Sequence, residues 1–326
     1  MRVLVTGGAG YIGSVVVEQL LCRGYEVVVV DNLKEGHREA VLPEAAFYEG
    51  DFGDRGLLDR IFEEHRIDAV LHFAADAQVA DSMVDPSKYF LTNVSKGLVL
   101  LEAMRACGCD RMIFSSTAAT FGEPKYTPID ENHPQEPINA YGESKLMFER
   151  MLDWYRKAYG LKFMSFRYFN AAGASERLGE DHRPETHLIP IVLQVALGKR
   201  EYVEVYGTDY PTKDGTPIRD YIHVLDLGRA HILGLEKLDR FPDGKYNLGN
   251  GEGFSVLEVI RTAEEVTGRK IPYREAQRRP GDPAVLVASS RKAARELGWE
   301  PEFPELKEII RSAWEWHRRH PQGYGP

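Results

Sequence analysis

Short apolar runs alternate with amphipathic stretches over the first half of the chain. Residues 3–5 lead into a glycine-rich turn, after which apolar residues recur at helical intervals up to Gly24. A second run, residues 27–30, consists only of valine, which is typical of a strand buried on both faces of a parallel sheet. The same patterns predict strands at 69–73, 112–115 and 161–169, and helices at 57–64, 98–107 and 141–159. This βαβα order predicts an α/β fold with a doubly wound parallel sheet.

The pattern changes after Asn170. Glycines, prolines and charged residues crowd residues 171–190, and the stretch 209–219 is rich in turn-forming residues. Amphipathic helices are predicted at 256–266 and at 305–318. We therefore predict a dinucleotide-binding domain over residues 1–170 and a smaller C-terminal α/β domain, mainly for the substrate, over 171–326. Later segments are allowed to return to the first domain.

The glycine turn after the first predicted strand has the spacing of a dinucleotide site. Gly7, Gly10 and Gly13 allow a tight turn, close approach to a pyrophosphate and close packing of the helix that follows. Asp31 ends the next predicted strand, where its carboxylate binds ribose hydroxyls and repels a 2′-phosphate. The pattern predicts NAD as the cofactor. A strand, turn and helix without a ligand remains the alternative.

A tyrosine, a lysine and a hydroxyl provide candidate chemistry. Tyr141 and Lys145 are one helical turn apart and share a face. A nearby ammonium and a positively charged nicotinamide favour the phenolate, which makes Tyr141 a candidate general base. Thr117 follows a predicted strand and is positioned to orient a reacting hydroxyl. Alternatively, the tyrosine and lysine are only solvated residues of an amphipathic helix.

Composition and charge narrow the class of protein. The 326 residues are 43% hydrophobic and include 41 Lys and Arg against 50 Asp and Glu, a formal net charge of −9. An overall attraction to nucleic acid or to anionic membranes is therefore not expected. No apolar run reaches the length of a membrane-spanning helix. Three cysteines do not form a disulfide framework, so we expect a cytoplasmic enzyme.

Several motifs together resemble a known family. Residues 6–13 (TGGAGYIG), residues 115–122 (SSTAATFG) and the Tyr141/Lys145 pair resemble the extended short-chain dehydrogenase/reductase superfamily. Residues 167–170 (RYFN), and above all the block 207–223 (GTDYPTKDGTPIRDYIH), narrow the resemblance to the UDP-glucose 4-epimerase family. The similarity extends from the first strand to about Trp299.

The resemblance implies a reaction and a set of cofactor contacts. In such enzymes Tyr141 removes the proton of the sugar 4-hydroxyl while hydride passes from C4 to NAD⁺, and hydride then returns to the opposite face of the 4-keto sugar. Lys145 holds the nicotinamide ribose, and Thr117 supplies the hydroxyl that many relatives take from serine. The other implied cofactor residues are Tyr11, Ile12, Asn32, Asp51, Phe52, Phe73, Ala74, Ala75, Asn93, Ser115 and Phe169. Read without the resemblance, Asp51 is equally a helix cap or turn residue.

The resemblance also implies contacts to a UDP-sugar. Besides Thr117 and Tyr141, the implied residues are Asn170, His187, Leu188, Tyr206, Arg219, Arg279, Asp282 and Leu286. Arginines suit a diphosphate and Asp282 suits ribose hydroxyls. Each also has a simpler interpretation, as a solvated arginine or a histidine that caps a turn. The spacing of His187 with His182 or His223 does not indicate a metal, and we predict none.

Two departures from the family pattern bear on function. Many relatives have a lysine where this chain has Ala77, which predicts weaker retention of the reduced cofactor. Leu286 stands where some relatives have a bulky tyrosine beside the sugar C2 substituent. The smaller side chain leads to the hypothesis that UDP-N-acetylhexosamines are accepted as well.

Alternative functions differ in what they require of the sequence. Another nucleotide-sugar epimerase, for example of UDP-glucuronate or UDP-pentoses, shares the same catalytic core. Dehydratases carry Asp-Glu after the active-site threonine, where this chain has Ala118 and Ala119. A simple dehydrogenase or an NAD-binding sensor remains possible. By resemblance a homodimer is expected, and helices 98–107 and 141–159 are candidates for its interface. A core role for the apolar faces of these helices is the stronger alternative.

Overall fold

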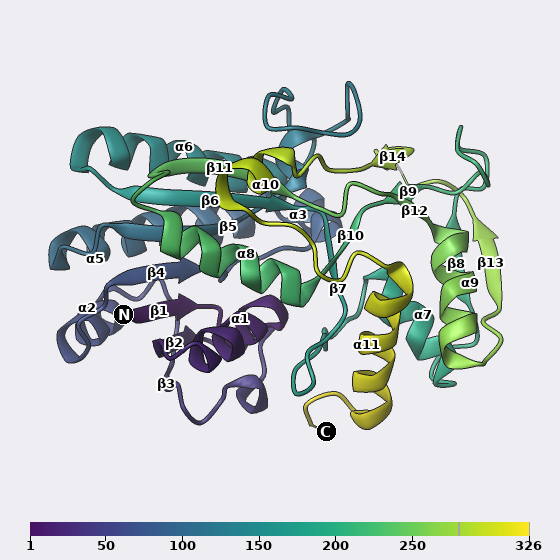
Figure 1. Cartoon of the computed structure of the whole chain (residues 1–326), viewed down its shortest axis with the longest axis horizontal. Coiled ribbons are helices and arrows are strands. Elements are labelled where there is room, and N and C mark those ends of the chain that lie inside the picture. The colour runs from purple at the N-terminus through teal and green to yellow at the C-terminus, as the bar shows by residue number, and fades with distance from the viewer. Residues whose placement is uncertain (280, 326) are drawn as a thin grey trace.

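A seven-stranded parallel sheet is the centre of the computed structural model, which describes residues 1–279 and 281–325 (Figure 1). Its strand order is β11-β6-β5-β4-β1-β2-β3, and every neighbouring pair is parallel. The chain order reverses between β1 and β4, which is where ligands bind in doubly wound sheets. The predicted Rossmann-type fold class is confirmed. The strands are β1 Arg2–Thr6, β2 Glu26–Asp31, β3 Ala46–Glu49, β4 Ala69–His72, β5 Arg111–Thr117, β6 Lys162–Tyr168 and β11 Asp243–Leu248.

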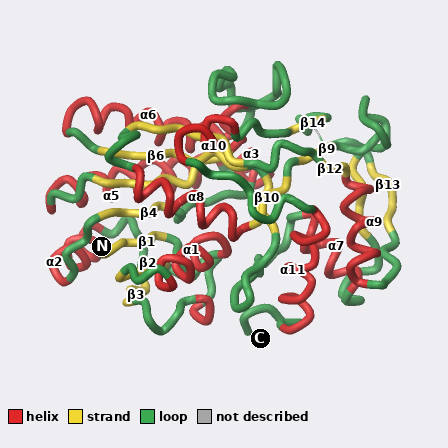
Figure 2. The backbone as a smooth tube through the Cα atoms, viewed as in Figure 1, coloured by secondary structure: helices red, strands yellow, loops and turns green. Residues whose placement is uncertain are grey.

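Helices cover both faces of this sheet (Figure 2). They enclose two separate hydrophobic cores. Alternate valines of β2 point into opposite cores, which explains why that strand is apolar at every position. One face is covered by α1 Tyr11–Cys22, α8 Val224–Lys237 and α10 Arg291–Leu297, and the other by α2 Arg55–Glu64, α5 Gly97–Cys107 and α6 Ala140–Tyr159. Shorter helical segments are η1 Arg38–Ala40, α3 Val79–Val84, α4 Pro86–Tyr89, η2 Phe90–Lys96 and η3 Ala118–Phe121.

A smaller unit with a third core lies beyond the carboxyl ends of the strands (right in Figure 1). Its helices α7, α9 and α11 pack together around apolar residues such as Val192 and Ile309. Its strands form three small sheets, β10-β7, β12-β9-β14 and β13-β8. The elements are β7 Asn170–Ala172, α7 Leu188–Ala196, β8 Val203–Tyr206, β9 Ile218–Arg219, β10 Tyr221–His223, β12 Phe254–Ser255, α9 Val256–Thr267, β13 Tyr273–Ala276, β14 Val285–Leu286 and α11 Leu306–Arg319.

The two units are not consecutive along the chain. Strand β11, the outermost strand beside β6, is reached only after the chain has built α7 and β8. Helices α8 and α10 return with it to the large sheet. The domain division near residue 170 stays a prediction, with these three elements as its returning segments. None of the described helices is long and apolar enough to cross a membrane.

Two predicted strand ends shift in ways that matter for the site. Phe73 lies outside β4, because the amides of Phe73 and Ala74 both donate to Thr6 O, each at 3.0 Å, and turn the chain across the end of β1. Strand β5 runs on through Thr117 instead of ending at Ser115, since Thr117 remains paired in register with Tyr168. Thr117 is therefore the last residue of a strand.

Candidate active site

The glycine turn closes over the end of β1 as the spacing predicts. Gly7 has a φ of +75°, and a Cβ there would lie 2.6 Å from Ala74 N. A Cβ on Gly13 would lie 2.1 Å from Gly7 O, so neither position admits a side chain. Gly10 begins α1 without a side-chain cap, which leaves the first amides of the helix for an anion. This cradle fits a pyrophosphate.

The predicted adenosine partner ends β2 beside the turn. Asp31 is buried, and its two carboxylate oxygens accept from Ala9 N at 3.0 Å and Leu33 N at 2.9 Å. Burial raises the pKa of Asp31, while these two amides lower it. The hydrogen bonds fix the carboxylate at the strand end, where further lone pairs suit ribose hydroxyls.

The other predicted cofactor residues gather at the same edge of the sheet. They follow successive strands, and parallel strands bring their carboxyl ends to one edge. Asn32 follows β2, Asp51 and Phe52 follow β3, Phe73, Ala74 and Ala75 follow β4, Ser115 lies in β5, and Phe169 follows β6. Tyr11 and Ile12 open α1, and the Tyr11 hydroxyl donates to Gly173 O at 2.6 Å.

Two predicted cofactor residues are engaged within the protein. The Asn93 side chain accepts from Asp76 N and donates to Asp76 O and Ser144 Oγ, each at 3.0 Å. It therefore ties the loop after β4 to α6. Asp51 accepts from Gly53 N at 2.8 Å, as a turn residue does, and also from Lys96 Nζ at 2.5 Å. Burial raises the pKa of Asp51, but the Lys96 and Gly53 contacts outweigh it and leave the pKa lowered.

The positively charged side chains beside the loop after β4 come from positions that the family pattern did not indicate. Ala77 removes the lysine that many relatives carry, but Lys34 Nζ lies 2.9 Å and Lys88 Nζ 3.6 Å from Asp76 Oδ1. Both positive charges thus sit beside the loop after β4. Only the loop geometry reveals them, because neither lysine is part of a motif.

The candidate catalytic residues meet where β5 and α6 approach each other. Asn139 caps α6 by accepting from Gly142 N at 2.8 Å, which sets the position of Tyr141 in the first turn. Burial raises the pKa of Tyr141, and a hydrogen bond with Thr117 acts in the opposite direction. Thr117, the last residue of β5, thus acts on the phenol, while its role in orienting a reacting substrate hydroxyl stays a prediction.

Lys145 is buried one turn further along α6. Its Nζ donates to Ser115 O at 2.9 Å and lies 4.9 Å from the centroid of the Phe114 ring. Burial lowers the pKa of Lys145 to about 7. The Lys145 ammonium is thus directed at the end of β5. In the protein without a cofactor the pKa of Tyr141 is raised, not lowered. The predicted phenolate then depends on the charge of a bound nicotinamide.

A buried ion pair holds α6 against the sheet. Arg167 in β6 donates to both carboxylate oxygens of Glu149, at 2.9 and 2.5 Å, and both side chains are almost fully buried. Ser116 Oγ donates to the same carboxylate at 2.5 Å. This network fixes the helix one turn beyond Lys145. The sequence analysis missed Glu149, whose only signal was its i+4 position after Lys145.

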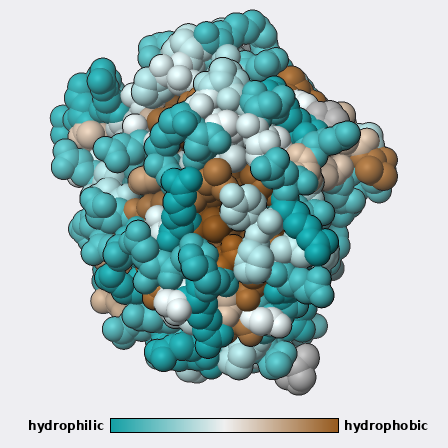
Figure 3. Space-filling model, turned by 90° about the vertical axis from the view of Figure 1, so that its right-hand side faces the viewer, coloured by the Kyte–Doolittle hydropathy of each residue, from teal (hydrophilic) through white to brown (hydrophobic). Residues whose placement is uncertain are grey.

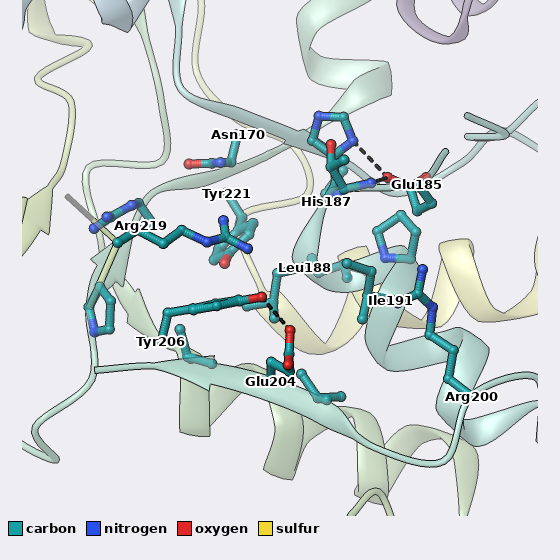
Figure 4. Close-up of a pocket in the computed structure, with 18 of the residues that line it drawn as sticks. Asn170, Glu185, His187, Leu188, Ile191, Arg200, Glu204, Tyr206, Arg219 and Tyr221 are labelled. Atoms are coloured by element: carbon teal, nitrogen blue, oxygen red, sulfur yellow. Dashed lines mark hydrogen bonds and ion pairs between the residues drawn. The ribbon is translucent and has the colours of Figure 1, made fainter. Parts of the chain in front are cut away.

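A cavity of about 710 Å³ begins at Asn170, two residues beyond the end of β6, and Thr117, Tyr141 and Lys145 are not among its described lining residues (Figure 4). It is lined by β7, the start of α7, and segments of β8, β9 and β10. Figure 3 shows the corresponding side of the molecule, where apolar side chains are visible between hydrophilic ones. Seven predicted substrate residues line this one cavity, namely Asn170, His187, Leu188, Tyr206, Arg219, Arg279 and Asp282.

The charged residues of the cavity contact one another. Arg219 forms an ion pair with Asp282 and donates to Ile218 O at 2.7 Å. The Arg279 guanidinium lies 3.9 Å from the centroid of the Tyr206 ring. Leu286 is not among the described lining residues, but it pairs in register with Arg219 through β14 and β9. Two cations, an aromatic face and a carboxylate suit a nucleotide diphosphate.

Further residues line the cavity without having been predicted. Arg200, Glu204 and Tyr221 belong to this group, and Figure 4 shows them around the same opening. Arg200 Nε donates a hydrogen bond to Gln194 Oε1 at 2.7 Å, and the Tyr206 hydroxyl donates one to the Glu204 carboxylate. Tyr221 lies in the block 207–223 that carried the resemblance, and this position could have indicated it as a cavity residue. Arg200 and Glu204 had none.

The chain belongs to the NAD dependent epimerase/dehydratase family, whose profile matches residues 3–249. It is 53% identical to a UDP-glucose 4-epimerase of Lacticaseibacillus casei, over 100% of this chain and 99% of that protein. A solved UDP-glucose 4-epimerase structure superposes with a TM-score of 0.98 at 52% identity, with both chains fully covered. The UDP-glucose 4-epimerase of Bifidobacterium longum, solved with NAD+ and UDP, superposes with a TM-score of 0.94 at 40% identity, over 99% of this chain and 100% of that one. The resemblance predicted from the motifs is confirmed.

Proposed function

We propose that this chain is an isomerase that interconverts UDP-glucose and UDP-galactose by NAD-dependent 4-epimerisation. One observation carries the proposal above all. The cavity lined by Arg219, Arg279 and Asp282 opens at Asn170, the first residue of β7 and two residues beyond β6, and β6 is paired with the strand that ends at Thr117. A nucleotide-sugar cavity and a Tyr/Lys/Thr constellation therefore adjoin in one molecule.

NAD fits the edge of the large sheet. The turn at Gly7, Gly10 and Gly13 receives the pyrophosphate, and Asp31 receives the adenosine ribose. A bound NAD would supply the redox chemistry, that is, the reversible acceptance of hydride from C4 of the sugar. No second substrate is required, because the reaction is redox-neutral overall.

The chain's own residues move and position the proton. Tyr141 takes the proton of the sugar 4-hydroxyl and later returns it. Thr117 acts against burial by lowering the pKa of the Tyr141 phenol, and it orients the reacting hydroxyl. Lys145, whose Nζ donates to Ser115 O, holds the nicotinamide ribose.

The cavity holds the UDP part while the hexose is presented to Tyr141. Arg219 and Arg279 pair with the diphosphate, and Asp282 accepts from ribose hydroxyls. Tyr206, Asn170 and Leu188 complete the wall. Because Arg219 and Asp282 are paired with each other before substrate binds, binding exchanges part of that ion pair for contacts with the nucleotide.

A panel of UDP-sugars tests the proposal. The full chain is purified, its bound NAD is measured after denaturation, and UDP-glucose, UDP-galactose, UDP-glucuronate and a UDP-pentose are incubated with it separately, without added cofactor. Interconversion of the first two is the expected result. Turnover of only the acid or the pentose identifies another epimerase. A requirement for added NAD with net formation of NADH identifies a dehydrogenase, and bound NAD without turnover identifies a sensor.

We also propose that N-acetylated UDP-hexoses are substrates. Leu286 is half-buried and lies across from Arg219 in neighbouring strands, next to the cavity. A leucine leaves more room there than a tyrosine. The enzyme should therefore turn over UDP-GlcNAc, and Leu286→Tyr should remove that activity while UDP-glucose turnover persists. Absence of UDP-GlcNAc turnover in the unmodified enzyme contradicts this specificity but not the epimerase assignment.

A homodimer through α5 and α6 is part of the proposal. Both helices expose large apolar side chains, including Leu98 on α5 and Met147 and Trp154 on α6. Neighbouring Val84 and Leu91 extend the same apolar character. Light scattering should give twice the mass of the 36.9 kDa chain, and Trp154→Glu should shift it toward the monomer. A wild-type monomer at micromolar concentration contradicts the dimer.

We propose a cytoplasmic location for the enzyme. Cys22, Cys107 and Cys109 are all free thiols in the structure, which suits a reducing compartment. Cell fractionation with a tagged full-length chain tests this location. Recovery with membranes or outside the cell contradicts it.

A further inference from the structure

Four metal-ligating side chains converge in the segment that links β7 to α7. Glu180, His182, Glu185 and His187 each offer one atom, and these atoms all lie within 4.8 Å of one another. We call this group the histidine–glutamate cluster. Both glutamate side chains are about 95% buried, with 5% of Glu180 and 4% of Glu185 exposed. Carboxylates this deeply buried need a positive partner.

The spacing of the ligand atoms is close to that around a single ion. His187 Nδ1 lies 2.9 Å from both Glu180 Oε1 and Glu185 Oε1. His182 Nδ1 lies 3.1 Å from Glu180 Oε1 and 3.7 Å from Glu185 Oε2. Four ligands at zinc–nitrogen and zinc–oxygen bond lengths of about 2.0–2.2 Å stand roughly 3.3 Å apart in a tetrahedron. Only small side-chain movements separate the cluster from that geometry.

One ligand is already oriented by a second set of contacts. Glu185 Oε1 accepts from the amides of Thr186 and His187, each at 2.7 Å. These bonds hold the carboxylate in place so that its other oxygen, Oε2, is turned toward His182. Metal-ligating carboxylates are typically fixed by hydrogen bonds of this kind.

We propose that the histidine–glutamate cluster binds one divalent transition-metal ion, with Zn²⁺ the best match. Two imidazole nitrogens and two carboxylate oxygens suit zinc, whereas Mg²⁺ and Ca²⁺ prefer oxygen ligands throughout. Two carboxylates balance the charge of a divalent ion. With four protein ligands the coordination is complete, which is characteristic of a structural site, not a catalytic one.

The site's position gives it a role in shaping the substrate cavity. Glu185 and His187 line the cavity, and Figure 4 shows them interacting at its edge, immediately before α7 begins at Leu188. A metal there ties this edge to Glu180 and His182. His187 engages the cluster through Nδ1, so Nε2 is left for a ligand in the cavity. The predicted substrate role of His187 is therefore compatible with metal binding.

The sequence alone gave no reason to predict this site. The histidines considered with His187 were His182 and His223, and His223 Nε2 instead lies 2.9 Å from Ser312 Oγ. The two glutamates complete the ligand set, and only the fold of residues 180–187 brings all four together. The earlier expectation of no metal followed from histidine spacing alone.

Metal analysis of the full chain tests the site independently of epimerase activity. The protein is expressed with zinc, freed of loosely bound metal and analysed by mass spectrometry for metals. We expect about one zinc per chain. His182→Ala and Glu180→Gln should each lower zinc affinity by at least about tenfold. Glu176→Gln, an exposed glutamate in the same segment, serves as the matched control and should bind zinc like the wild type.

A second measurement needs no variant. Wild-type protein is stripped with a chelator and titrated with Zn²⁺ or Co²⁺. Zinc should raise the melting temperature, and cobalt should give the visible absorption of a tetrahedral site with nitrogen and oxygen ligands. Less than about a tenth of a zinc per chain, with no thermal shift and no cobalt spectrum, overturns the proposal and leaves the cluster as an ion-pair network. Equal zinc binding by His182→Ala also overturns it.

Discussion

The cofactor edge and the substrate cavity are assembled in different ways. At the cofactor edge, the functional residues follow successive strands of one sheet, and Asp31 and Lys145 are fixed by backbone groups nearby. The cavity takes its residues from several short elements between Asn170 and Asp282. Its charged groups are held by each other, as in the pair of Arg219 and Asp282, which are 63 residues apart.

This difference explains how strongly each region depends on the local sequence. A parallel sheet brings the carboxyl ends of its strands to one edge whatever the loops contain, so a motif after a strand defines a place in the molecule. The two-residue strands β9 and β14 do not fix a position in the molecule in this way, because they pair with residues that are distant in the chain. Mutations should therefore affect chemistry and stability in the first region and substrate affinity in the second.

The largest expected effect belongs to the cofactor region. Tyr141→Phe removes the acid–base group and should lower kcat by about 10²- to 10⁴-fold, with NAD content and the melting temperature nearly unchanged. Tyr159→Phe, an exposed tyrosine of the same helix, is the control. Steady-state kinetics and quantitation of bound NAD measure both variants. Near-normal turnover by Tyr141→Phe contradicts the proton-transfer role.

The second-largest effect should be the loss of stability when the buried ion pair of Glu149 and Arg167 is broken. Glu149→Gln leaves the Arg167 guanidinium buried without its full negative partner, so the free energy of unfolding should fall by about 3–5 kcal/mol. Glu63→Gln, at an exposed helix position, should change it little. Urea unfolding of both variants gives the comparison. A loss below about 1 kcal/mol would show that α6 is held mainly by its apolar contacts.

The cavity should respond through substrate affinity. Arg219→Lys keeps a positive charge but loses the bidentate geometry, and a charged hydrogen bond is worth about 1.5–3 kcal/mol. The KM for UDP-glucose should therefore rise roughly 10- to 100-fold, with NAD content unchanged. Arg318→Lys, at an exposed position of α11, is the matched control. If kcat falls and KM stays constant, Arg219 acts on the chemistry and the contrast between the regions fails.

The last expected effect is a pH dependence of stability. Burial lowers the pKa of Lys145 from an ordinary 10.5 to about 7, so between these values the unfolded chain binds more protons than the folded one. The free energy of unfolding of the NAD-free protein should thus rise with pH across this window, relative to Lys145→Met. Lys157→Met, on an exposed part of α6, should retain the wild-type slope. Parallel curves for wild type and Lys145→Met contradict the shift.

How much the sequence could predict follows the same division. The valines of residues 27–30 and the glycine turn are local patterns, and they predicted β2, α1 and the edge that faces the cofactor. The apolar side of the helix at Tyr141 predicted a shared face for Tyr141 and Lys145, but not that Ser115 O receives the ammonium. That contact depends on the register between a strand and a helix far apart in sequence.

The cavity was predictable only through the family resemblance. Taken alone, Arg219 and Asp282 are isolated charges, and no spacing rule joins two residues that are 63 positions apart. Arg200 and Glu204 were missed because they lie in an ordinary charged loop and strand. Likewise Lys34 and Lys88 reach the loop after β4 through the fold alone. Long-range pairing, not local propensity, determines these contacts.

The late arrival of β11 has a consequence for biosynthesis. A ribosome makes α7 and the short strands around the cavity before residues 243–248 emerge to cover the free edge of β6. Until then the nascent chain carries an unpaired strand edge, which is prone to association with other chains. The large sheet and the cavity therefore mature together, late in synthesis, and a stall between residues 170 and 243 would release a chain with neither finished.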